Sequence, residues 1–361
     1  MATEIVQLRH PDEFPPDVAL LFEEGQRDSI ALGSRWFRNF IDTVAQDEVQ
    51  VCFHVLRRDG HALVALPVLE RRAALHRGVE ALGNYYTALY APLVHREATA
   101  QDVAELLREV RRSHAPMASL RLQPMDPQSR AWQVLLPALR LASLRPFTFF
   151  CFQNFFLRAP PDWASFLAQR NSKMRSNIKR MEKKLAQEGG RVEIVVDPTE
   201  CERGIDAYLQ VYERSWKRDE PYPRFMPGLI RHAAEEGWLR LGLAWLDGRP
   251  IAAQVWLVAN RKADIYKVAY DEAFKEYSPG TVLTAHLMQH VIEHDGVAEV
   301  DFLIGDDAYK KNWMSDCRER WGVIAYNPAT PAGAFGAARE ALARMLKPAW
   351  LRLRGLRPIA R

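Results

Sequence analysis

The sequence predicts a mixed α/β protein with two domains. Its 361 residues exceed what one core usually organises, and about 150 residues per domain is typical. Segments with helical periodicity alternate with short apolar runs typical of strands. Asp59-Gly60 and Asp247-Gly248 each separate two such runs, which indicates antiparallel hairpins. We therefore expect an α/β (α+β) fold with mixed, largely antiparallel sheets.

The first predicted domain covers residues 1–158. Helical periodicity is present at residues 16–24, 36–43 and 103–110, and strand-like runs at 51–56, 62–69 and 120–122. Residues 147–157 are aromatic and β-prone, and their length fits one or two buried strands better than a membrane span. Together these segments predict an α/β unit.

A long basic helix is predicted at residues 163–187, and we expect it to join the two domains. Pro160-Pro161-Asp162 provide a break and a cap before it, and Gly189-Gly190 end it. Its basic cluster consists of Arg170, Lys173, Arg175, Lys179, Arg180, Lys183 and Lys184. Such a cluster is either a solvated helix face or a site for a phosphate-bearing partner.

The second predicted domain covers residues 159–330. After the basic helix we expect a strand at 192–196, a helix at 205–216, strands at 238–246, 251–258 and 265–270, a helix at 281–294, a strand at 299–304, a helix at 309–317 and a strand at 323–326. The first domain shows a similar order, so we expect the two to be structural duplicates.

Composition excludes several classes of protein. Hydrophobic residues make up 48% of the chain, and no window reaches the ~18 consecutive apolar residues of a membrane span. Residues 1–9 lack a secretory signal pattern, so we expect a cytoplasmic protein. The four cysteines are far apart, and His286, His290 and His294 are staggered along one helix, so no metal is expected.

Residues 331–361 form a basic amphipathic tail. They contain seven Lys and Arg residues and one Glu, whereas the whole chain has a net charge of only +4. Apolar residues, among them Phe335, Leu342 and Met345, alternate with these charges. The tail is therefore suited either to lie on an anionic membrane surface or to dock on the body of the protein.

The turn at residues 277–281 connects a strand-rich segment to a helix. The first turn of a helix exposes free N–H groups at the positive end of the helix dipole, which favours an anion. A plain helix start, with Ser278 as cap and Pro279 in the first turn, explains the same residues. The predicted donor-binding residues are Lys275, Ser278, Pro279, Gly280, Thr281 and Val282.

Several short motifs follow one another in the second domain. They are Lys173-Met174-Arg175-Ser176-Asn177-Ile178-Lys179-Arg180, Trp216-Lys217, Asp247-Gly248-Arg249-Pro250-Ile251-Ala252-Ala253, Ser278-Pro279-Gly280-Thr281-Val282-Leu283, Asp301-Phe302-Leu303-Ile304-Gly305-Asp306, Tyr309-Lys310 and Trp313. With the order of elements given above, they resemble the acyltransferase fold of the GNAT superfamily. Residues 165–325 are most similar to the FemAB-like branch and to CelD-like acetyltransferases of exopolysaccharide biosynthesis. Through Ser34-Arg35-Trp36-Phe37 and Asn84-Tyr85-Tyr86 the first domain resembles the N-terminal half of such proteins, which implies two tandem GNAT-like domains.

The resemblance implies an acyltransferase that moves an acyl group, such as acetyl, from acyl-CoA to a hydroxyl or amine of a sugar or cell-envelope precursor. A FemAB-like enzyme would instead take an aminoacyl group from tRNA, a donor that the basic helix would suit. A non-catalytic binding protein on the same fold is a third hypothesis. It is favoured by the loss of all turn glycines except Gly280, and by Arg318 where ordinary members carry a Tyr.

The resemblance also indicates the site. A base is needed to take the acceptor's proton, for which Asp301, Asp306 and Glu213 are candidates, Asp301 first. Tyr309 is the candidate acid. The pantetheine arm of the donor is expected between residues 265–270 and 299–304, with the acceptor entering between the two halves. The predicted acceptor-pocket residues are Glu213, Trp216, Lys217, Tyr266, Lys267, Tyr270 and Lys310.

Overall fold

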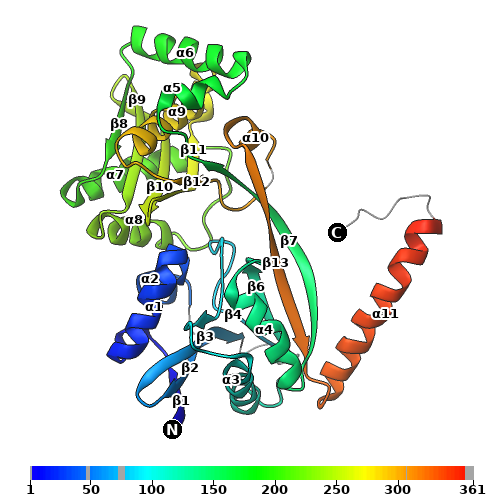
Figure 1. Cartoon of the computed structure of the whole chain (residues 1–361). Coiled ribbons are helices and arrows are strands. Elements are labelled where there is room, and N and C mark those ends of the chain that lie inside the picture. Colours follow the sequence, from blue (N-terminus) through cyan, green and yellow to red (C-terminus); the bar gives the residue numbers. More distant parts are fainter. Residues whose placement is uncertain (1, 46–48, 72–77, 306, 354–361) are drawn as a thin grey trace. The chain divides into compact units, whose positions relative to one another are not determined.

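The computed structural model describes residues 2–45, 49–71, 78–305 and 307–353. It divides into two compact units, Met1–Cys151 with Arg320–Arg361, and Phe152–Glu319. The chain crosses between them within strand β7 (Arg145–Arg158) and again within strand β13 (Asp316–Tyr326) (Figure 1). The crossings lie after Cys151 and after Glu319, whereas the sequence led us to expect boundaries after residues 158 and 330. Helix α11 (Pro331–Leu353), which covers most of the predicted tail, groups with the first unit.

The first unit is built on a sheet in the strand order β1-β2-β3-β4-β6-β13, with β5 beside β3. Strands β2 and β3 form the predicted hairpin, in which Asp59 and Gly60 both have positive φ. Its elements are β1 (Thr3–Leu8), η1 (Pro11–Glu13), α1 (Pro16–Asp28), η2 (Ile30–Leu32), α2 (Ser34–Thr43), β2 (Val49–Arg58), β3 (His61–Arg71), β4 (Gly78–Ala81), β5 (Leu93–Val94), α3 (Ala100–Ser113), β6 (Ser119–Met125) and α4 (Arg130–Leu141).

The second unit has the strand order β7-β12-β11-β10-β9-β8, antiparallel except between β12 and β11. The predicted fold class, α/β with mixed and largely antiparallel sheets, is confirmed. Its other elements are α5 (Trp163–Ala168), α6 (Ser172–Gln187), β8 (Arg191–Val195), η3 (Pro198–Glu200), α7 (Cys201–Glu213), α8 (Phe225–Glu235), β9 (Leu239–Leu246), β10 (Arg249–Ala259), β11 (Lys262–Tyr270), η4 (Glu272–Tyr277), α9 (Pro279–Glu293), β12 (Glu299–Asp301) and α10 (Lys310–Trp313).

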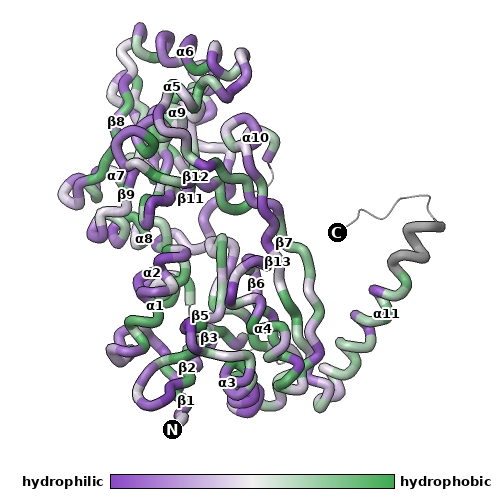
Figure 2. The backbone as a smooth tube through the Cα atoms, in the orientation of Figure 1, coloured by the Kyte–Doolittle hydropathy of each residue, from purple (hydrophilic) through white to green (hydrophobic). Residues whose placement is uncertain are grey.

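The predicted basic helix is two helices, α5 and α6, because Asn171 caps a new helix by accepting from the Met174 amide. Helix α6 lies inside the second unit and is not the connection between the units. Its apolar positions Met174, Ile178, Met181 and Leu185 are buried in that unit's core cluster, which they share with α9. Figure 2 shows the rest of α6 as mainly hydrophilic.

Strands β11 and β12 separate after three residue pairs, and this gap positions the site. Their parallel pairing covers Lys262 to Asp264, and β12 ends at Asp301 instead of the predicted residue 304, because Leu303 has φ 54°. The register between β10 and β11 shifts, so that Tyr266 is an extra residue in β11. In the described part of the chain, β11 therefore runs on to Tyr270 without a partner on its β12 side.

None of the described helices is long and apolar enough to cross a membrane.

Candidate active site

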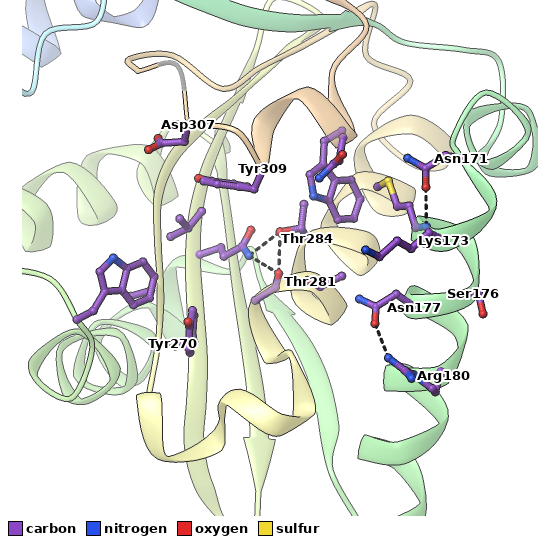
Figure 3. Close-up of a pocket in the computed structure, with 18 residues that line it drawn as sticks. Asn171, Lys173, Ser176, Asn177, Arg180, Tyr270, Thr281, Thr284, Asp307 and Tyr309 are labelled. Atoms are coloured by element: carbon purple, nitrogen blue, oxygen red, sulfur yellow. Dashed lines mark hydrogen bonds between the residues drawn. The ribbon is translucent and has the colours of Figure 1, made fainter.

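The second unit contains a cavity of about 960 Å³ at the gap between β11 and β12 (Figure 3). Its walls come from α6 and its cap, from β10, β11, α10 and the start of α9, and from the segments that follow α7 and β12. The lining residues are Asn171, Lys173, Met174, Ser176, Asn177, Arg180, Trp216, Gln254, Val268, Ala269, Tyr270, Gly280, Thr281, Thr284, Asp307, Tyr309, Asn312 and Trp313. A cavity of this size accommodates a drug-sized ligand.

The first turn of α9 offers fewer free N–H groups than the sequence suggested. The amides of Thr281 and Val282 both donate to the Ser278 carbonyl, at 2.9 and 3.2 Å, and Pro279 has no N–H. Ser278 adopts a left-handed conformation with φ 46°. In this turn, as the structure describes it, the Gly280 amide remains for a ligand. The predicted cradle of several backbone donors is thus reduced to one.

A buried hydrogen-bond network fixes that turn. Gln254 on β10 donates from Nε2 to the Gly280 carbonyl at 3.0 Å and to Thr284 Oγ1 at 2.8 Å. The indole N–H of Trp256 donates to Gln254 Oε1 at 2.9 Å. Sequence analysis missed Gln254 and Thr284, although a lone amide within an apolar strand was an available signal.

One face of α6 forms a cationic wall of the cavity. Lys173, Ser176, Asn177 and Arg180 follow helical spacing and line the cavity together. Figure 3 shows Lys173 extending from α6 toward Thr281. The sequence identified these residues only as part of a basic cluster, because their position relative to α9 depends on the tertiary packing of α6.

Aromatic and acidic side chains lie at the rim. The rings of Trp216 and Tyr270 are 4.6 Å apart between centroids, and Trp216 is 48% exposed. Tyr309 packs edge-on against Phe302, and partial burial together with the negative charge of Asp307 raises the pKa of its phenol to about 12. Asp307 is the acid that lines the cavity in the described part of the chain. Asp306 lies outside the described residues.

The structure gives Asp301, the first predicted base, a different environment. Its carboxylate is buried, accepts from the amide of Leu303 at 2.7 Å and from Asn154, and pairs with Lys262 and Arg318. Burial alone would raise the pKa of Asp301, but the two cations and these hydrogen bonds lower it. A carboxylate so occupied, and absent from the cavity lining, is poorly placed to take a proton from a ligand.

Arg318 belongs to the same buried cluster and has a structural role there. Its guanidinium donates to Asn154 on β7 at 2.6 Å, to Glu299 at 2.7 Å and to Asp301. Arg318 therefore joins β12 to β7. Ordinary GNAT members carry a catalytic Tyr at this position, whereas here Arg318 is a structural cation.

Several other predicted site residues lie away from the cavity lining. Lys310 is buried with its ammonium on the carbonyls of Ile304 and Gly305, so it holds the loop after β12. Lys267 pairs with Glu220 at 2.5 Å. The rest are Glu213, exposed at the end of α7; Val282, buried in the core; Tyr266 at the bulge; and Lys275, Ser278 and Pro279, which flank the start of α9.

Lys217 lies next to this rim without lining the cavity. Burial and the positive charge of Lys267 lower the pKa of its ammonium to about 8.

Among the residues that the structure describes, no group of three or more His, Cys, Asp or Glu side chains is arranged to hold a metal ion.

Part of the chain is similar to a known domain family. Residues 172–311, which supply most of the cavity, match the family model of the acetyltransferase (GNAT) domain. The fold is also found in FemX, with a TM-score of 0.59, 13% identity and coverage of 82% of this chain and 92% of that one. L-PGS from Bacillus licheniformis gives a TM-score of 0.51 and 11% identity, over 81% of this chain and 88% of that one.

At these identities the two structures share the fold with this chain. A sequence search of curated proteins found no match. By sequence, residues 172–311 are similar to the acetyltransferase (GNAT) domain, and FemX and L-PGS share the fold of this chain.

Proposed function

We propose that the protein is an acyltransferase that moves an acyl group from acyl-CoA to a hydroxyl or amine of a sugar or cell-envelope precursor. The observation that carries this proposal is the cavity at the gap where β11 leaves β12, beside the first turn of α9 and within the segment that matches the acetyltransferase domain. An unpaired strand edge can form hydrogen bonds with the amides of an extended pantetheine arm.

The donor's phosphates would lie on α6. Lys173 and Arg180 present side-chain cations to the cavity, whereas the start of α9 contributes the single amide of Gly280. Side-chain cations bind phosphates strongly because their hydrogen bonds are charge-assisted. We therefore propose that recognition of the donor's phosphates has moved from the helix N-terminus to the wall formed by α6.

The proposed chemistry uses Asp307 and Tyr309. The acceptor oxygen or nitrogen attacks the thioester carbonyl, a C–O or C–N bond forms, and the C–S bond breaks. Asp307 takes the acceptor's proton. The phenol of Tyr309, which stays protonated at neutral pH because its pKa is raised to about 12, donates a hydrogen bond to the developing charge and a proton to the leaving thiolate.

The acceptor is proposed to be a sugar because of the aromatic pair at the rim. Trp216 offers an exposed indole backed by Tyr270, and such a flat apolar surface next to polar groups suits one face of a pyranose. The resemblance to CelD-like acetyltransferases favours an acceptor from exopolysaccharide or envelope synthesis.

A second candidate is transfer of an aminoacyl group from tRNA. The observation that favours it is that basic residues of α6 continue outside the cavity, where Lys179 and Lys183 are exposed. A small donor would need Lys173 and Arg180 alone, whereas an RNA backbone would extend over the outer residues as well.

Donor binding tests these alternatives. We expect acetyl-CoA or a longer acyl-CoA to raise the melting temperature, since a ligand at 100 times its Kd adds about 2.7 kcal/mol. In an assay of CoA release with sugar acceptors, Lys173→Ala with Arg180→Ala should raise the donor KM at least tenfold. The matched pair Lys179→Ala with Lys183→Ala, on the same helix, should leave it unchanged.

The outcomes separate the hypotheses. Stabilisation by aminoacyl-tRNA but not by acyl-CoA, with both pairs of substitutions weakening binding and flattening its salt dependence, would favour the RNA donor. No stabilisation by either donor would contradict acyl transfer and favour a binding protein.

A further inference from the structure

Helix α11 has two apolar faces, and one of them packs on its own unit. Gly333 and Gly336 allow close approach, since a Cβ at either position would lie under 3 Å from Asn327 or Tyr326. Ala337 is buried, and Arg344 stacks on Phe147 at 5.1 Å and donates to the Thr148 carbonyl. This inward face accounts for docking of the helix, one of the two roles predicted for the tail.

The opposite face leaves large apolar side chains in solvent. Phe335 is 71% exposed, Leu342 56%, Met345 76% and Leu346 56%. At 100° per residue these positions lie on one side of the helix, opposite Gly333, Ala337 and Arg344. Figure 2 shows α11 as largely hydrophobic with hydrophilic positions between. A stripe of this kind is uncommon on a surface that contacts water alone.

The composition of the tail favours an anionic partner. Residues 331–361 contain seven Lys and Arg residues and one Glu. That acid, Glu340, pairs with Arg344 at 3.0 Å, so its charge is already compensated. A second copy of the same helix would bring like charges together, whereas an anionic lipid surface would attract them.

We propose that the outward face of α11 is a peripheral membrane anchor for anionic phospholipid. The helix would lie in the plane of the membrane surface, with Phe335, Leu342, Met345 and Leu346 among the acyl chains and the basic residues at the headgroups. This arrangement needs no unfolding, because the inward face stays docked on the first unit. It is independent of the proposed acyl transfer.

Sedimentation of the full chain with vesicles tests the proposal. We expect binding to phosphatidylglycerol-containing vesicles, at least tenfold weaker binding to pure phosphatidylcholine, and loss of binding at high salt. Phe335→Glu with Leu342→Glu should weaken binding at least tenfold without changing the melting temperature, because both side chains are exposed. The matched control is Leu20→Glu with Leu141→Glu, at positions that are 52% and 48% exposed elsewhere in the same unit.

Three results would overturn the proposal. The first is that the wild type does not sediment with anionic vesicles at all. The second is that the α11 double variant binds as tightly as the wild type, and the third is that it and the Leu20→Glu, Leu141→Glu control lose binding equally. A concentration-dependent dimer that the α11 substitutions dissociate, without vesicle binding, would also overturn it and would identify a second copy as the occupant.

Discussion

Asp264 of β11 and Asp301 of β12 lie opposite each other in the last pair before the two strands separate. The ammonium of Lys262 is 2.9 Å from the first carboxylate and 3.0 Å from the second. Two buried carboxylates at such a position require compensation, which Lys262 and Arg318 provide. The cluster therefore holds the strands together at the point where the cavity begins.

Asp301→Asn is expected to lower the free energy of unfolding by about 3 kcal/mol or more, because it leaves buried cations without their charge partner. Urea unfolding measures this change. Glu299→Gln, in a side chain that is 25% exposed, should cost less than about 1 kcal/mol. Equal stability of wild type and Asp301→Asn would show that the cluster does not support the fold.

The stability of the fold should fall as the pH is lowered, and His54 should be one cause. Its ring is fully buried, with Nε2 2.9 Å from His114 Nε2, while Nδ1 of His114 contacts Glu70. Burial and the neighbouring His114 lower the pKa of His54 to about 3. Below about pH 6.5 His54 takes up a proton in the unfolded chain but stays neutral in the folded chain. The free energy of unfolding is therefore highest above that pH and declines toward pH 3.

The expected loss from this one group is about 2 kcal/mol between pH 7 and pH 5. Urea unfolding at both pH values measures it. His54→Gln should reduce the pH dependence, whereas His61→Gln, at an exposed position, should not. The assignment fails if the pH dependence is the same in wild type and His54→Gln.

Tyr309→Phe is expected to lower kcat ten- to a hundredfold with little change in donor KM, because the phenol would act on charge that develops during transfer. Since its pKa is raised to about 12, no loss of rate from Tyr309 ionisation should occur below pH 10. Tyr85→Phe is a matched control, at 48% exposure against 44% for Tyr309. An unchanged kcat would remove Tyr309 from the proposed chemistry.

Lys217 should be unusually reactive toward amine reagents. Because its pKa is lowered to about 8, roughly a hundredfold more of it is neutral at pH 8 than of an ordinary lysine. Limited labelling with peptide mapping should find Lys217 modified before Lys179. Lys267→Met removes a nearby positive charge and should slow the labelling. Uniform labelling of the lysines would contradict the lowered pKa.

The sequence predicted most elements of the second unit because their periodicity is strong. The hairpin at Asp247-Gly248 is present, with positive φ at both residues, and α9 begins at Pro279, two residues before the predicted start. Prediction was weaker where contacts between distant parts of the chain decide where an element ends. Strand β12 ends early because Leu303 has a positive φ, and Asn154, 147 positions away from Asp301, bonds both that carboxylate and the Leu303 carbonyl.

Some of the proposed site residues line the cavity, and others do not. Gly280, Thr281, Trp216, Tyr270 and Tyr309 do line one cavity, as local motifs suggested. Polar residue type alone could not show which acids are already paired. Asp301 and Lys310 look functional in sequence, yet both are buried with protein partners that lie on other segments or in the backbone.

The extra residue at Tyr266 shifts the phase of β11. Before it, Ala263 and Ile265 belong to the core cluster around α9, and after it the side chains packed against that cluster are those of Val268 and Tyr270. A strand of uninterrupted alternation would turn Lys267 and Ala269 toward α9 instead. One inserted residue thus decides that an aromatic ring, and not the methyl group of Ala269, lies beside Trp216, with the two ring centroids 4.6 Å apart.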